Sequence, residues 1–348
     1  MIAQPRARLL KVLAIVVGIA VVGGLLYLLF LRQPQKVTQH YLAELKSIYS
    51  TPDTLENFFA NVNDVWLDNA TGRLYVLDTK TSCFVVFDTS LNFLYRVGRG
   101  GDAADEFAFP RWIRSRDSMI YVSDAGHGRL KLLDTAGRYV TALPLSWPQL
   151  MNPFAVDSSG HIILNASFES DSLLALYDMS GRIVRQFGRR IKQSTEQGTL
   201  RRNLVSPMVG EDGSIYAVFQ SLPYIRKYSK DLQLLLEKDL TSAAEVHYIL
   251  DKTRKNEQTN PNMIHSMVGG VYYRWPYLYV NYGTGLPHGS TLFAYDAKTL
   301  ELREAIMANR SAHSWDSVRV VWSFVVLPGG DVVSFDMNSG RLVKYAVR

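Results

Sequence analysis

The side chains best suited to acid-base or metal chemistry are few and scattered in this sequence. It holds seven histidines and one cysteine, Cys83, among 348 residues. The histidines show neither the His-x-x-x-His nor the His-Glu-x-x-His spacing that places two ring nitrogens on one zinc ion. The sequence also lacks the Gly-x-Ser-x-Gly turn of hydrolases and a phosphate-binding loop. We therefore assign no catalytic and no metal-binding residue from local motifs.

Residues that are distant in sequence can still meet where a fold gathers its loops around one axis. Scattered Asp, Glu, Asn and His side chains could hold calcium or zinc there, and a hydrolase or lyase is the corresponding alternative function. The polar, Gly-rich loop from Asn281 to His288 is one candidate for a binding role. His127 is another, although a lone loop histidine is more often a surface residue. The sequence requires no cofactor, and calcium or zinc is expected only under this alternative.

A basic segment is the other chemically distinctive feature. Residues 189 to 202 contain five basic side chains and a single acidic one, Glu196. Such a loop could bind an anionic partner, although a solvated charged loop is the commoner meaning of this composition. The candidate binding residues here are Arg189, Arg190, Lys192, Arg201 and Arg202.

Short β-rich segments recur along the chain and must position these residues. The spacing is about 42 to 63 residues, in the range of propeller blades. Each copy lies between further apolar runs and tight turns, which predicts four strands per copy. Such sheets bury both faces only when they pack around an axis. The sequence therefore predicts an all-β, six-bladed β-propeller. The six copies are Leu74–Asp78, Ile120–Asp124, Ile162–Asn165, Ile215–Val218, Leu278–Asn281 and Val332–Asp336.

Two further segments are expected to complete this ring. The last copy ends after its third strand, so a strand within Ile48 to Phe59 is expected to supply the fourth and to close the propeller. Residues 241 to 261 form an insertion that begins Ser242-Ala243-Ala244-Glu245, which has capping-box spacing. Apolar residues follow at helical intervals, so a short helix is predicted there.

The N-terminal residues carry a membrane signal. No residue from Val12 to Leu31 is charged, and an apolar run of this length spans a bilayer as a helix. No small-x-small cleavage site follows closely, which favours a signal anchor over a cleaved signal peptide. Three basic residues precede the run and two follow it, which favours a cytoplasmic N-terminus. The expected segments are a cytoplasmic tail (1–11), the transmembrane anchor (12–31), a juxtamembrane linker (32–47) and a periplasmic or extracellular propeller (48–348).

The flanks of this anchor account for the basic character of the chain. Residues 1–36 contain five Lys or Arg and no Asp or Glu, so subtracting five from the formal charge of +6 leaves +1 for the remainder. A nearly neutral body lacks the electrostatic footprint of a nucleic-acid binder. We therefore expect the membrane, through residues 12–31, as one partner and do not expect nucleic acid.

The second copy carries a distinctive order of residues: Val97-Gly98-Arg99-Gly100-Gly101, Glu106-Phe107, Pro110, Ile120–Asp124 and His127-Gly128-Arg129-Leu130. This order resembles the NHL-repeat family of six-bladed propellers, within the TolB-like propeller superfamily. His127 stands where the family usually has Asn. The resemblance implies a propeller scaffold, and it implies no particular activity. Calcium-dependent lactonases and zinc-dependent lyases have a similar fold.

The function that needs no missing residue is a membrane-anchored binding or scaffold module for a protein, peptide or glycan partner. The metal-dependent hydrolase or lyase remains the alternative, with its site in the central channel. Tryptophans could stack on sugar rings, but burial between blades is their more common role. The residues considered for stacking are Trp112, Trp147, Trp275, Trp315 and Trp322.

Overall fold

The computed structural model describes residues 37–49, 59–166, 170–241, 244–259, 266–282, 291–307, 321–336 and 340–348. The chain divides into two compact units, residues 1–37 and 38–348. No helix among the described residues is long and apolar enough to span a membrane. The expected anchor, residues 12–31, lies outside the described residues.

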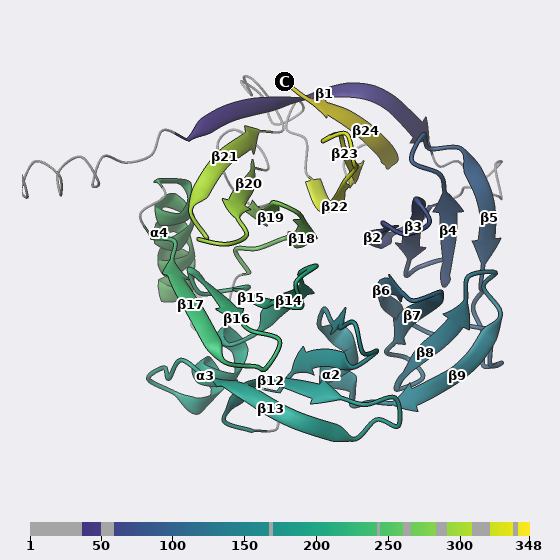
Figure 1. Cartoon of the computed structure of the whole chain (residues 1–348), viewed down its shortest axis with the longest axis horizontal. Helices are drawn as coiled ribbons and strands as arrows, with labels where there is room; N and C mark the ends of the chain where they lie inside the picture. The colour runs from purple at the N-terminus through teal and green to yellow at the C-terminus, as the bar shows by residue number, and fades with distance from the viewer. Residues whose placement is uncertain are drawn as a thin grey trace, which may run out of the picture. The chain divides into compact units, whose positions relative to one another are not determined.

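Residues 38–348 form six blades around a central axis, as Figure 1 shows. The prediction of an all-β, six-bladed propeller is confirmed. The first four blades are antiparallel sheets of four consecutive strands each. They comprise β2 (Val62–Asp68), β3 (Arg73–Asp78), β4 (Cys83–Phe87), β5 (Phe93–Val97); β6 (Pro110–Arg116), β7 (Met119–Asp124), β8 (Arg129–Asp134), β9 (Tyr139–Pro144); β10 (Ala155–Val156), β11 (Ile162–Asn165), β12 (Ser172–Tyr177), β13 (Ile183–Arg189); and β14 (Val205–Val209), β15 (Ile215–Phe219), β16 (Tyr224–Tyr228), β17 (Leu234–Asp239).

The last two blades share one eight-stranded sheet. Its strands are β18 (Gly270–Arg274), β19 (Tyr277–Tyr282), β20 (Thr291–Asp296), β21 (Leu302–Met307), β22 (Val321–Val326), β23 (Val332–Asp336), β24 (Arg341–Val347) and β1 (Thr38–Tyr49). β1 pairs in parallel with β21 and then antiparallel with β24, so this one strand joins the two blades. In Figure 1 it runs along the outer edge of both.

β1 begins earlier than the sequence indicated. A closing strand was expected within residues 48–59, but β1 starts at Thr38 and ends at Tyr49. The stretch 32–47, expected as a linker, therefore contains most of this strand. Its second half pairs Leu42 with Val347 and Tyr49 with Arg341, which occupies the free edge of β24. An open sheet edge exposes unpaired backbone groups, and β1 covers this one.

The core lies between neighbouring blades. Middle strands such as β3 and β4 are buried on both faces, which explains their nearly unbroken apolar sequences. Phe84 and Val86 of the first blade belong to one buried cluster with Ile113 and Val122 of the second. Outer strands such as β13 are largely exposed. Each blade is thus stabilised by its two neighbours rather than by a core of its own.

The antiparallel order gives the ring two distinct faces. One face, which we call the turn face, carries the turns between first and second strands and between third and fourth strands of each blade. The other, the connection face, carries the turns between second and third strands and the connections from blade to blade. Three helices are described: α2 (Trp147–Met151), α3 (Glu196–Arg202) and α4 (Ala244–Thr259). α4 confirms the helix predicted within residues 241–261.

Candidate functional site

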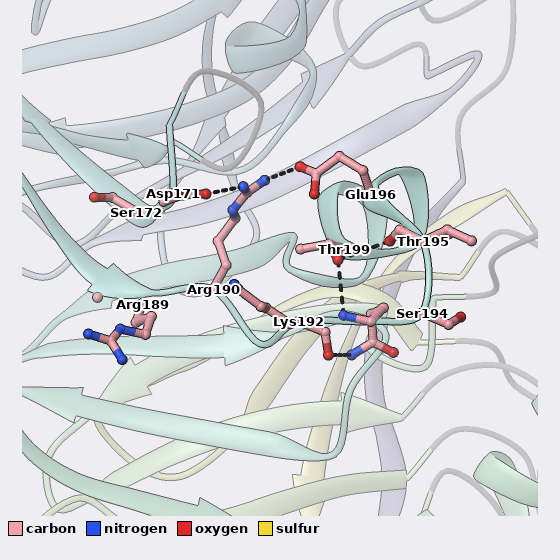
Figure 2. Close-up of a pocket in the computed structure, with 11 residues that line it drawn as sticks. Asp171, Ser172, Arg189, Arg190, Lys192, Ser194, Thr195, Glu196 and Thr199 are labelled. Atoms are coloured by element: carbon pink, nitrogen blue, oxygen red, sulfur yellow. Dashed lines mark hydrogen bonds and ion pairs between the residues drawn. The ribbon is translucent and has the colours of Figure 1, made fainter.

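A cavity of about 710 Å³ opens at the connection face of the third blade, and Figure 2 shows the residues that line it. It lies between the start of β12, the end of β13 and the connection that contains α3. Its lining is polar and charged, with hydroxyl, amide, carboxylate and basic groups. The lining residues are Asp171, Ser172, Gly188, Arg189, Arg190, Lys192, Gln193, Ser194, Thr195, Glu196 and Thr199. We call this cavity the basic pocket.

Local hydrogen bonds hold α3 in place beside the pocket. Thr195 caps the helix, because its hydroxyl accepts a hydrogen bond from the amide of Gly198 at 3.0 Å. The buried Asn203 follows the last turn, and its amide group bonds both the N–H and the carbonyl of Ile191, at 2.7 and 2.9 Å. Hydrogen bonds within the connection therefore fix both ends of the helix.

Arg190 crosses the pocket and is held by two carboxylates. Its guanidinium donates to Glu196 at 3.0 Å and to Asp171. The arginine side chain is only 10% exposed, whereas the carboxylates are 95% exposed at Asp171 and 69% at Glu196. The hydrogen bond from Arg190 lowers the pKa of Asp171 below its ordinary value. Figure 2 shows Arg190 between the two acids.

Arg189 and Lys192 differ from Arg190 because neither forms an ion pair within the described part of the chain. Both are exposed, and both line the pocket. The backbone of Arg189 is fixed, since its carbonyl accepts a hydrogen bond from Arg226 at 2.5 Å. The two carboxylates of the lining already bind Arg190. The pocket therefore presents two cations that remain available to an incoming anion.

The structure thus brings together three of the predicted binding residues: Arg189, Arg190 and Lys192 line the basic pocket. Arg201 and Arg202 lie in the last turn of α3 and are not among the residues that line it. Basic residues suit this position because the C-terminal end of a helix carries partial negative charge.

His127 lies in a turn of the connection face on the second blade, apart from the basic pocket. Its Nδ1 is 2.6 Å from Asp124 and its Nε2 is 3.1 Å from Asp102. Asp124 is fully buried, and it also accepts hydrogen bonds from the amides of Ala108 and Phe109 at 3.0 Å. Asp124 therefore joins the turn to the strand entering the blade, and this geometry gives His127 a structural role.

Asn281 and His288 have separate outcomes. Asn281 is buried in β19, and its side-chain amide has no hydrogen-bond partner among the described residues. His288 lies outside those residues. The described segments also contain no group of three or more His, Cys, Asp or Glu side chains that could hold a metal ion. The predicted loop site, residues 281–288, therefore stays a prediction.

The central channel contains a charged pair that the sequence analysis missed. Arg114 of β6 donates to Asp64 of β2 at 2.6 Å, and each side chain is 5% exposed. Ser323 of β22 and the amide of Ile113 also donate to this carboxylate, at 3.1 and 3.0 Å. The cavity around the pair is only about 20 Å³, which is about the space of one water molecule. The available sequence signal was one carboxylate and one guanidinium in the first strands of neighbouring blades.

Comparisons with known proteins identify the fold. No family model matches the sequence, and no curated protein matches it. A protein described as exported, from Bacteroides fragilis, superposes with a TM-score of 0.59 at 15% identity, covering 90% of this chain and 99% of that one. A member of the DUF4221 family from Bacteroides vulgatus gives 0.56 at 11%, with 90% and 99% covered.

A third similar structure is a streptogramin B lyase. It gives a TM-score of 0.52 at 12% identity, covering 89% of this chain and 98% of that one. At these identities the similarity shows a six-bladed propeller fold and carries no activity to this chain. The resemblance to NHL repeats remains a prediction.

Proposed function

We propose that this chain is a membrane-anchored, extracytoplasmic binding propeller that captures an anionic group of a protein, peptide or glycan partner in the basic pocket. The observation that carries the proposal is that the three basic side chains of the pocket differ in their partners and exposure. Two carboxylates hold Arg190 in place, whereas Arg189 and Lys192 are exposed beside a cavity of about 710 Å³ and form no ion pair with any residue that the structure describes. A carboxylate, sulfate or phosphate group has the complementary charge.

The compartment is part of this proposal. Residues 12–31 form an uncharged run with more basic residues before it than after it, which favours an anchor with the propeller outside the cytoplasm. The described export of the similar protein from Bacteroides fragilis supports this location. Labelling of the full chain with a membrane-impermeant amine reagent tests it, in intact cells and in cells from which any outer membrane has been removed. Labelling of propeller lysines only after the cytoplasmic membrane is broken would contradict it.

The strength of binding follows from the exposure of the two cations. Single exposed ion pairs contribute about 0–1 kcal/mol, so Arg189 and Lys192 must act together with the hydroxyls of the pocket. Exposed charges are screened by salt, with a Debye length of about 8 Å at physiological ionic strength. We therefore expect a partner that is released as the salt concentration rises.

Affinity capture from native membranes tests the pocket directly. The full chain is compared with the double variant Arg189→Glu/Lys192→Glu and with Arg182→Glu/Arg185→Glu, which makes the same change of charge at exposed positions that do not line the pocket. We expect the same partner with the native chain and the control, and its loss with the pocket variant. A partner retained equally by all three proteins would overturn the proposal.

A further inference from the structure

A second cavity, of about 290 Å³, opens at the turn face of the ring. It is built from the first turns of the first, second and fourth blades, together with β18 of the fifth. Trp66 and Tyr272 line both this cavity and the narrow channel that contains Arg114. We call it the mouth cavity. It lies on the face opposite the basic pocket and shares no lining residue with it.

One wall of the mouth cavity is a supported aromatic ring. Tyr273 is half-buried and stacks on Tyr216, with ring centroids 5.5 Å apart and 28° between the planes. Tyr216 is itself fixed, because its hydroxyl donates to the carbonyl of Ala297 at 2.7 Å. A Cβ at Gly210 would lie only 3.3 Å from both rings, so glycine permits the close approach. Tyr273 is thus held from one side only.

A buried hydroxyl belongs to the same cavity. Tyr272 is 1% exposed, and its hydroxyl makes no hydrogen bond of normal geometry among the described residues, although the side chains of Asn69 and Arg274 lie near it. Its burial raises the pKa of this phenol to about 12, so the group keeps its proton near neutral pH. An unsatisfied buried hydroxyl is costly and calls for an explanation. A ligand group that both donates and accepts would satisfy it.

The rim of the mouth cavity offers both donors and acceptors. Glu211 and Asp117 are exposed carboxylates, and Arg116 lies beside them with its Nε 3.7 Å from Asp117. Carboxylates and a guanidinium thus stand side by side in this lining, which suits a ligand that both donates and accepts hydrogen bonds. Neutral hydroxyl groups bind both kinds of side chain.

We propose that the mouth cavity binds a neutral sugar ring, which stacks on Tyr273 and forms hydrogen bonds with Tyr272, Glu211 and Arg116. A sugar combines an apolar ring face with hydroxyls that donate and accept, and this combination matches the wall and rim. The site is separate from the anion-binding function proposed above. Either one can fail without the other.

The test uses the full chain in phosphatidylcholine nanodiscs, because alkyl maltoside detergents carry a sugar headgroup. The probes are glucose, galactose, mannose, N-acetylglucosamine and maltose, and binding is followed by saturation-transfer NMR and by the tryptophan fluorescence of the chain, to which Trp66 contributes. Empty nanodiscs give the background. We expect at least one of these sugars to bind with a dissociation constant of about 1–10 mM.

Three variants locate the binding. Tyr272→Phe removes a hydroxyl, Glu211→Gln replaces a charged acceptor with a neutral amide, and we expect each to weaken sugar binding about tenfold. Tyr75→Phe is the matched control, because the buried Tyr75 hydroxyl likewise makes no hydrogen bond of normal geometry among the described residues but does not line the mouth cavity. Its sugar binding should equal that of the native chain. Circular dichroism melts confirm that all three variants fold.

The outcomes are distinct. Loss of sugar binding in Tyr272→Phe and Glu211→Gln, with binding intact in Tyr75→Phe and in Arg189→Glu/Lys192→Glu, supports the proposal. Absence of binding by every sugar up to about 100 mM overturns it, as does equal binding by all variants. Binding of spermidine in preference to all five sugars also overturns it, because the cavity would then be a cation site.

Discussion

The basic pocket and the mouth cavity are built in opposite ways. The pocket belongs to one blade, and a single connection with its helix α3 supplies most of its charged groups. The mouth cavity belongs to four blades, each of which contributes a short turn or a strand end. Below it, Arg114 and Asp64 join the first and second blades at the axis. A change in the pocket should therefore stay local, whereas a change at the axis should affect the whole ring.

The largest effect is expected at the axis. Arg114→Met leaves Asp64 as a buried carboxylate without its cation, which should lower the free energy of unfolding by about 3–5 kcal/mol. Urea denaturation measures this loss. Adding Asp64→Asn to Arg114→Met removes the buried charge and should restore about half of it or more. A loss below about 1 kcal/mol in the single variant would show that this buried ion pair contributes little to the packing of the first blade on the second.

Two asparagines of the third blade test whether the pocket is local. Asn203→Ala removes the hydrogen bonds to Ile191. The free energy of locally opening the connection should fall by about 1–3 kcal/mol, which speeds hydrogen exchange in residues 190–204. Asn165→Ala removes bonds to the N–H and carbonyl of Val205 in the next blade, at 2.9 and 2.8 Å. Asn165→Ala should instead lower the urea midpoint of the whole ring. The same response in both variants would contradict a local pocket.

Arg190→Met is the counterpart of Arg114→Met in the pocket. Its two partners are mostly exposed, so solvent compensates them when the cation is lost. We expect the free energy of unfolding to change by about 1 kcal/mol or less. Partner capture should weaken as well, because Asp171 and Glu196 lose the cation that they bind and their negative charge then competes with an incoming anion for Arg189 and Lys192. A loss as large as that in Arg114→Met would remove the distinction between the two regions.

The smallest effect concerns pH. Because Arg190 lowers the pKa of Asp171, this carboxylate contributes stability above its unfolded pKa, and the contribution is lost as the pH falls through the folded value. The melting temperature of the native chain should therefore exceed that of Asp171→Asn slightly at pH 6, and the difference should shrink as the pH falls below the ordinary aspartate pKa of about 3.9. A difference that grows in acid would reverse the sign of this linkage.

The ring could be predicted from the sequence because its signal is local and repeated. Each blade has its own apolar strands and turns in consecutive sequence, and the pattern recurs six times. The position of β1 could not be predicted. Tyr41, Leu42, Leu45, Ile48 and Tyr49 are spaced as on one face of a helix. The free edge of β24 and the outer strand β21 impose the strand there, so tertiary pairing overrides the local pattern.

The two cavities also differ in whether their residues are neighbours in the sequence. The basic pocket was visible as a run of charge, because Arg189, Arg190 and Lys192 are neighbours in sequence. The mouth cavity has no such signal, since Trp66, Glu211 and Tyr272 come from three blades and meet only in the closed ring. Trp66 is the one tryptophan of six that was not among the residues considered for stacking.

β1 also has a mechanical consequence. A load that pulls along this strand from Thr38 acts on both of its pairings, because its first part pairs with β21 and its second part pairs with β24. The antiparallel hydrogen bonds to β24 lie perpendicular to such a load and resist it together, whereas the parallel bonds to β21 are slanted. Two blades thus share the force on a single strand. The rate at which the ring unfolds under force measures how well it resists such a load.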